Sequence, residues 1–254
     1  MNASNNHDED SSIETEEITE AEFYKRNINH DNDENAILGF SFLRLVRRDP
    51  TIKSLTVTNE CACSIERAGL DVNLYRDTLT DDQIKFLESL GFEVDDYSEN
   101  APVIGRHIAN LPNLHTIILE DARSCLMDSE YKDMFQEASG STSIKTLIFR
   151  RCRLDQCFGV ATDVFATILY TEGVKEVTFE NCTLDYTFIE ILNEVAYELH
   201  WSMLRFEQCK FKHHLMHHIV AEKYDTRMTK TLIFNQCQSI SANGEVFNIP
   251  SYQA

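Results

Sequence analysis

A strand-like motif recurs along the second half of the chain and limits the folds that this sequence can adopt. Its clearest copy, residues 144–154, has apolar side chains at alternate positions and a cysteine where the alternation ends. Alternation of this kind predicts a short β-strand with one buried face. From Leu147 the step is 30 residues to Val177, 27 to Leu204 and 28 to Leu232. Such a period indicates a solenoid, in which each unit buries its apolar face against its neighbours.

The segments between these strands carry apolar residues at helical spacing, so strands and helices are expected to alternate. Parallel strands joined by helical crossovers also satisfy the handedness rule for such connections. Strands are expected at 52–59, 114–122, 144–150, 174–180, 202–207 and 230–236, and helices at 34–48, 80–90, 103–111, 126–138, 156–171, 186–199 and 213–224.

Composition divides the chain into an acidic tail over residues 1–32 and a repeat domain over 33–254. The tail is polar and has few large apolar side chains, which predicts disorder. Residues 61–99 fit the period worst, and a degenerate repeat and an ordered insertion both remain open. Residues 241–254 form a polar C-terminal tail, so either this tail or a partner is expected to cap the last repeat.

Charge argues against several classes of partner. The formal net charge is −19, and residues 1–36 hold eleven Asp or Glu against Lys25 and Arg26, so −9 of it lies there and −10 elsewhere. An acidic chain is a poor phosphate binder, so neither nucleic acid nor an anionic membrane is expected as a partner. No secretory signal and no apolar run of about 20 residues is recognised. We therefore expect an intracellular protein, cytoplasmic or nuclear, with its eight cysteines reduced.

The repeated pattern Leu-x-x-Leu-x-Leu-x-x-Cys-x-Leu resembles the leucine-rich repeat family, and its period is most similar to the ribonuclease-inhibitor-like subclass. The resemblance covers residues 114–240 well, 34–60 fairly and 61–113 poorly. The chain departs from the family in using phenylalanine at the last strand leucine. The resemblance implies an α/β solenoid with a curved parallel sheet on the concave face and helices on the convex face.

Two sets of metal-ligating residue types occur in the sequence. The recurring cysteines lie one repeat apart rather than at the local spacing of zinc sites, so buried thiols bonded to the turn backbone are preferred over a metal or redox ladder. A histidine cluster offers i,i+4 pairs on one helix but no further ligand, so it is only a weak metal candidate. The cysteines are Cys152, Cys182, Cys209 and Cys237, and the histidines are His213, His214, His217 and His218.

The strand positions between the buried ones point away from the helices and form rows across the sheet. The arginines of these rows would form a basic island among acidic neighbours, with Ile118 and Ile148 as an exposed apolar pair beside it. Arginine is enriched among interface anchors, so this concave face is the candidate partner-binding site. Its expected residues are Ile118, Glu120, Asp121, Ile148, Arg150, Arg151, Arg153, Glu180, Arg205 and Glu207. The alternative role of these charges is cross-strand pairing that stabilises the sheet.

These observations predict a monomeric, non-enzymatic scaffold that binds another protein on the concave face. No nucleophile elbow, phosphate-binding glycine loop or metalloprotease motif is found, so no enzyme activity and no cofactor is expected. A second hypothesis is a metal- or pH-responsive module that uses the histidine helix 213–218. A third is a structural arc whose convex helices self-associate.

Overall fold

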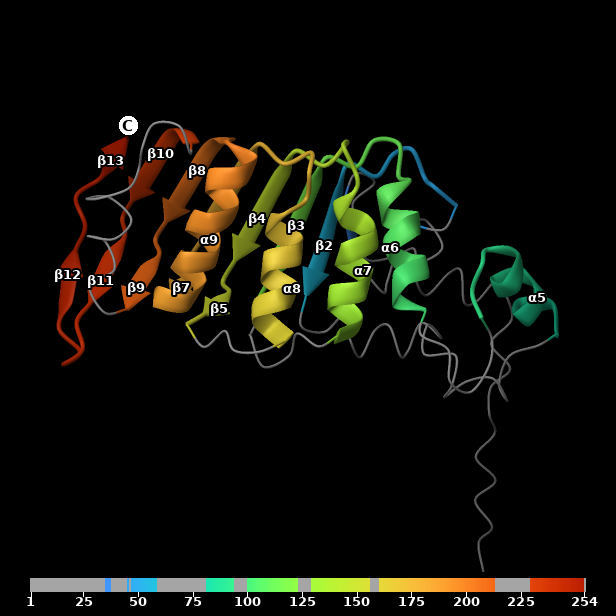
Figure 1. Cartoon of the computed structure of the whole chain (residues 1–254), viewed down its shortest axis with the longest axis horizontal. Coiled ribbons are helices and arrows are strands. Elements are labelled where there is room, and N and C mark those ends of the chain that lie inside the picture. The colour runs from blue at the N-terminus through green and yellow to red at the C-terminus, as the bar shows by residue number, and fades with distance from the viewer. Residues whose placement is uncertain are drawn as a thin grey trace, which may run out of the picture.

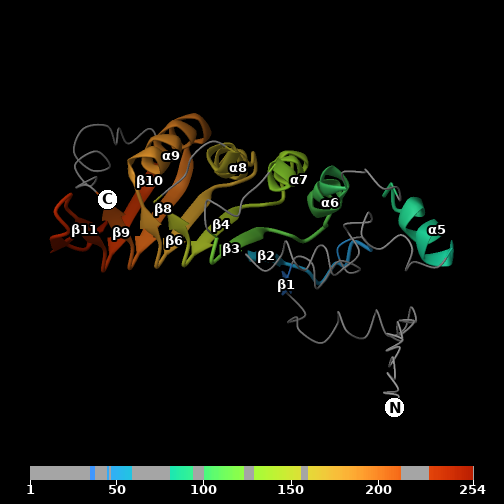
Figure 2. The same cartoon turned by 90° about the horizontal axis from the view of Figure 1, so that it is seen from below.

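The computed structural model describes residues 35–37, 45, 47–58, 81–93, 100–122, 129–155, 160–212 and 229–253. Over these residues the chain is a mixed α/β protein built around one large sheet, with helices along one of its faces (Figures 1 and 2). None of the described helices has the length and apolar character needed to cross a membrane.

The large sheet has eight strands, in the order β1-β2-β3-β4-β6-β8-β10-β13. Every neighbouring pair is parallel except the last, in which β13 runs antiparallel to β10. Its strands are β1 (Asn35–Ile37), β2 (Ser54–Thr58), β3 (Thr116–Glu120), β4 (Thr146–Arg150), β6 (Glu176–Glu180), β8 (Trp201–Glu207), β10 (Thr229–Asn235) and β13 (Tyr252–Gln253). The strands expected from the repeat are therefore confirmed.

Helices α6 to α9 lie side by side on one face of this sheet (Figure 2). They are α6 (Ala101–Ala109), α7 (Ser129–Ser139), α8 (Val160–Leu169) and α9 (Tyr186–Leu199), as expected from the apolar spacing. The Asp185 side chain caps α9 by accepting a 3.1 Å hydrogen bond from the Phe188 amide, and His200 ends the helix with φ 51°. These local contacts set both ends of α9.

A second sheet of five short strands runs beyond the carboxyl ends of the main strands, in the order β12-β11-β9-β7-β5. Its strands are β5 (Arg153–Leu154), β7 (Thr183–Leu184), β9 (Lys210–Lys212), β11 (Gln238–Ile240) and β12 (Val246–Asn248). The expected polar tail at 241–254 therefore contributes two antiparallel strands, β12 and β13, which end the two sheets.

The core lies between the large sheet and the helices, where the last buried position of the strand is a phenylalanine in four consecutive units. Neighbouring rings stack with centroids 4.8, 5.2 and 5.1 Å apart from Phe149 through Phe179 and Phe206 to Phe234. Phe188 of α9 meets the Phe179 ring edge-on at 5.7 Å. Stacked and edge-on aromatic pairs add to the free energy gained by burial, so these phenylalanines fill the core between the sheet and the helices.

Two expectations for the N-terminal part change. The helix expected at 34–48 is wrong over residues 35–37, which form strand β1, because parallel pairing with β2 satisfies backbone groups that would otherwise lie at the sheet edge. Strands β2 and β3 are direct neighbours, so residues 61–99 place no strand between them, as an insertion would. Within that segment α5 (Asp81–Ser89) is the expected helix.

Candidate functional site

The candidate site is the side of the large sheet opposite α6 to α9, called here the helix-free face. In β3 and β4 every second residue is buried against the helices, while the residues between them are half-buried on the other side. The strand register places Glu120 beside Arg150 and Arg150 beside Glu180. Two residues earlier on the same strands, Ile118 lies beside Ile148. The rows expected from the sequence are therefore brought together.

The charged row is a chain of ion pairs. Arg150 Nε donates to Glu180 Oε2 at 2.8 Å, and its Nη1 donates to Glu120 Oε1 at 3.4 Å. The hydrogen bond to Glu180 raises the pKa of the Arg150 guanidinium, although partial burial acts to lower it. Glu207 continues this row on β8, and Arg205 Nη1 donates to its Oε1 at 3.0 Å from the neighbouring row, that of Ile148 and Thr178.

Arg151 lies in the neighbouring row, where each strand turns toward the second sheet. Its guanidinium donates twice to Asp121, from Nε to Oδ1 at 2.9 Å and from Nη2 to Oδ2 at 2.8 Å. Its Nη2 also lies 3.0 Å from Glu120 Oε1. Arg151 and Asp121 both have positive φ, 53° and 55°. Their amides donate to the next strand, to Glu180 O at 2.8 Å and Arg150 O at 2.9 Å. This strand pairing holds a conformation that residues other than glycine rarely adopt.

The expected basic island is therefore neutralised by its own surroundings. Three guanidinium groups, of Arg150, Arg151 and Arg205, share the helix-free face with four carboxylates, so this set has a net charge of 3 − 4 = −1. The carboxylates belong to Glu120, Asp121, Glu180 and Glu207. Arg150 therefore forms the cross-strand ion pairs that were expected from the sequence as the alternative to a partner-binding basic island.

Arg153 belongs to a different place from the other expected site residues. It lies on β5 of the second sheet, where its Nη2 is 3.3 Å from Asp155 Oδ2, and Lys212 of β9 pairs with the same carboxylate. The Asp155 side chain is only 1% exposed. Burial acts to raise the pKa of Asp155, but the hydrogen bonds from Lys212 and Arg153 lower it overall. This buried carboxylate joins two strands of the second sheet.

The apolar row is less exposed than the sequence suggested. Ile118 and Ile148 are half-buried rather than fully exposed, as is Ile233 at the far end of the row. Between Ile148 and Ile233 the row contains Thr178, which is buried at 8% exposure, and Arg205. The helix-free face therefore offers a shallow apolar strip beside a charged ladder.

The recurring cysteines are buried and structural, as preferred from their spacing. Cys182 donates from Sγ to Phe149 O at 3.2 Å, and Cys152, Cys209 and Cys237 make the equivalent bond to the preceding unit. Burial raises the pKa of the Cys182 thiol well above its usual range, which keeps it protonated as a donor. Each thiol thus satisfies a carbonyl at the turn between the two sheets.

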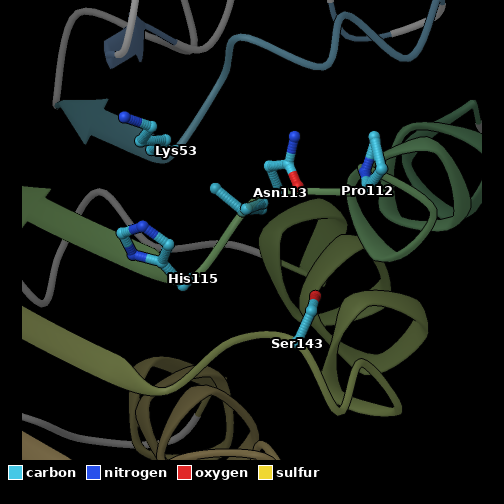
Figure 3. Close-up of a pocket in the computed structure, with 6 residues that line it drawn as sticks. Lys53, Pro112, Asn113, His115 and Ser143 are labelled. Carbon is cyan, nitrogen blue, oxygen red and sulfur yellow. The ribbon is translucent and has the colours of Figure 1, made fainter.

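The remaining candidates lie elsewhere. The histidine cluster 213–218 lies outside the described residues. Within the described ranges, no group of three or more His, Cys, Asp or Glu could hold a metal ion. An open pocket of about 320 Å³ lies before β2, β3 and β4, among residues that include Lys53, His115 and Ser143 (Figure 3). It lies at the amino ends of the strands, whereas ligands of open α/β sheets bind beyond the carboxyl ends.

Sequence reasoning missed the second sheet and its buried Asp155. The signal for the second sheet was present, because the alternation continues past each cysteine to Leu154, Leu184 and Phe211, all of which are buried. No signal marked Asp155, since its partner Lys212 lies 57 residues away in the sequence, a separation of 212 − 155.

Comparison with known proteins identified no relative of this chain. No protein-family model matches the sequence, and searches of the curated proteins and of the solved structures found no match.

Proposed function

We propose that this chain is a non-enzymatic, intracellular scaffold of the leucine-rich repeat type, with a curved, solenoidal arrangement of its units. It binds another protein on the helix-free face, which would be the concave side of that arc. The observation that carries the proposal is the juxtaposition of the apolar strip, Ile118 and Ile148, with the ion-pair ladder of Arg150. No described helix covers this face (Figure 2).

The ladder prepares the face for binding. Arg150 is held by carboxylates on both neighbouring strands, and Arg151 is held by Asp121 through two hydrogen bonds. Side chains that are already ordered lose less conformational entropy when a partner docks on them. Because the face is close to neutral, the partner is expected to bring both charge signs and an apolar group that covers Ile148, rather than a purely acidic surface.

Site-directed photo-crosslinking in a native lysate tests where a partner docks. A photoreactive phenylalanine analogue at Ile148 would report on the helix-free face. The same analogue at Tyr197, which is 61% exposed on α9, would report on the helix side. We expect one adduct of defined mass from position 148 and none of that mass from 197. An adduct at 197 alone, or at neither position, would overturn the proposal.

The identified partner then permits a quantitative test with matched variants. Ile148→Asp places a carboxylate in the apolar strip, and Tyr197→Asp places one on the helix side. We expect Ile148→Asp to weaken binding at least about tenfold, the equivalent of ~1.4 kcal/mol. Tyr197→Asp should leave the affinity within about twofold. Urea unfolding of both variants ensures that loss of folding is not counted as loss of binding.

A further inference from the structure

The C-terminal segment of the chain has almost no charged side chains. Residues 235–254 contain one charged side chain, Glu245, in a chain that is 26% charged overall. The cores of protein interfaces are depleted of charged residues in the same way. Strands β11 and β12 lie at this end of the molecule (Figure 1).

Strand β12 is the outer strand of the second sheet and is exposed along its whole length. All three of its residues are exposed, Val246 at 56% and Phe247 at 46%. An exposed apolar edge strand is a template for pairing with another strand, and proteins usually protect it with lysine or proline. Neither residue type occurs within β12.

The hydrogen-bond pattern shows which backbone groups of β12 face outward. The Ser241 amide donates to Glu245 O at 2.9 Å, and the Ile249 amide donates to Cys237 O at 2.9 Å. Hydrogen-bonded pairs alternate along an antiparallel ladder, so Phe247 directs its N–H and C=O groups toward Ser239 of β11. Val246 and Asn248 therefore direct their N–H and C=O groups away from β11.

We propose that β12 pairs antiparallel with β12 of a second copy of this chain, joining two five-stranded sheets across a twofold axis at Phe247. Val246 of each copy would then face Asn248 of the other, and each such pair exchanges two backbone hydrogen bonds. Glu245 would face Ile249, so no like charges oppose each other. The edge is thus self-complementary, which is what a twofold interface requires.

A second copy fits this edge better than a charged partner does. With a net charge of −19, two copies repel each other over most of their surfaces. Among the described segments, residues 235–254, which include β12, contribute least to this repulsion, because Glu245 is the one charged side chain among them. The proposal replaces the monomer expected from the sequence, and it is independent of the partner-binding role of the helix-free face.

Sedimentation equilibrium of the full chain over about 1–100 µM tests the oligomeric state. We expect the mass to rise from 29.3 kDa to twice that value. Val246→Lys places a charge on the edge of each copy, so we expect the dimer dissociation constant to rise at least about tenfold. Tyr197→Lys adds the same charge on α9 and should leave the dimer dissociation constant unchanged. A chain that stays monomeric would overturn the proposal. A dimer whose dissociation constant is not changed by Val246→Lys would overturn it as well.

Disulfide trapping tests the register. Residues opposite each other in a non-hydrogen-bonded antiparallel pair have Cα atoms ~4.5 Å apart, within disulfide reach. Phe247→Cys should therefore cross-link to its own counterpart under mild oxidation. Val246→Cys, whose counterpart lies diagonally across the pair, should cross-link several-fold less. The unsubstituted chain controls for its native thiols. Equal yields from the two variants would refute this register, and with it the proposed pairing.

Discussion

Gly105 lies in α6 where this helix meets α7, and its replacement by alanine is a sharp test of the helix packing. A β-carbon at this position would lie 2.7 Å from Glu137 Cβ and against the backbone oxygen of Met134. Carbon atoms in contact normally lie ~3.5–4.0 Å apart. Because the Met134 oxygen belongs to the backbone of α7, a side-chain rotation cannot relieve the clash, and the two helices would have to separate.

Two effects of opposite sign compete in Gly105→Ala. Alanine is favoured over glycine within a helix by about 1 kcal/mol. Overpacking of a well-filled interior costs about 1–3 kcal/mol, and contact with the rigid backbone of α7 places this case toward the upper end. We therefore expect a net loss of about 1–2 kcal/mol in the free energy of unfolding. Helix propensity alone would predict a gain.

Gly140→Ala is the matched control. Gly140 follows α7, its φ lies outside the left-handed region, and a β-carbon there would meet no atom within 4 Å. Alanine at such a site usually stabilises a protein by ~0.4–1 kcal/mol, because it restricts the unfolded chain. Urea unfolding followed by circular dichroism measures both variants. The reasoning fails if the two substitutions change stability in the same direction.

Three further perturbations probe the core, the buried carboxylate and the contact between α5 and α6. Phe179→Ala should lower the free energy of unfolding by about 3–5 kcal/mol in urea titration, since Phe179 is fully buried between two stacked rings. Asp155→Asn should cost about 1 kcal/mol near pH 6, because its partly exposed partners weaken the pair. The pKa of Asp155 is lowered in the folded state, so its contribution is present above the unfolded value of ~3.9 and is lost as the pH falls below it. Parallel unfolding titrations from about pH 6 to 2.5 should therefore converge for the two proteins. His107 Nε2 lies 3.1 Å from Leu90 O. Burial first, and then Arg48 and Arg106, lower its pKa against the opposing hydrogen bond. Amide exchange of residues 81–93, corrected for intrinsic rates, should accelerate as the pH falls below ~6.5, and His107→Gln should remove this dependence.

Strands β3, β4, β6, β8 and β10 of the large sheet and helices α6 to α9 could be predicted because local and long-range signals agree there. In the unit around Phe149, one set of positions specifies both the strand alternation and the contact with the next unit, so the period alone locates it. The carbonyl at the end of each strand needs a donor, and a small buried thiol such as Cys182 supplies one without adding bulk. Local pattern and tertiary packing therefore require the same residues.

Residues 35–37 show where that agreement ends. Ala36 and Ile37 suit an apolar helix face as well as a strand, so local pattern could not decide between them. The strand forms because residues 35–37 pair with the edge of β2. The pairing partner of Ala36 is Leu55, which lies 19 residues further along the chain. Pairing at a sheet edge is a long-range effect that short windows do not contain.

The candidate site was predictable in its composition but not in its electrostatics. Alternation placed Arg150 and Glu180 on one face, but it did not show that the arginine already has a carboxylate at 2.8 Å. This difference changes the expected behaviour of the site. A free basic island would bind an acidic partner with an affinity that falls steeply as salt rises. In the ladder, salt weakens the internal pairs as well as the contacts to a partner, so the two effects oppose each other. Binding at the helix-free face should therefore depend weakly on salt and strongly on the apolar strip at Ile118 and Ile148.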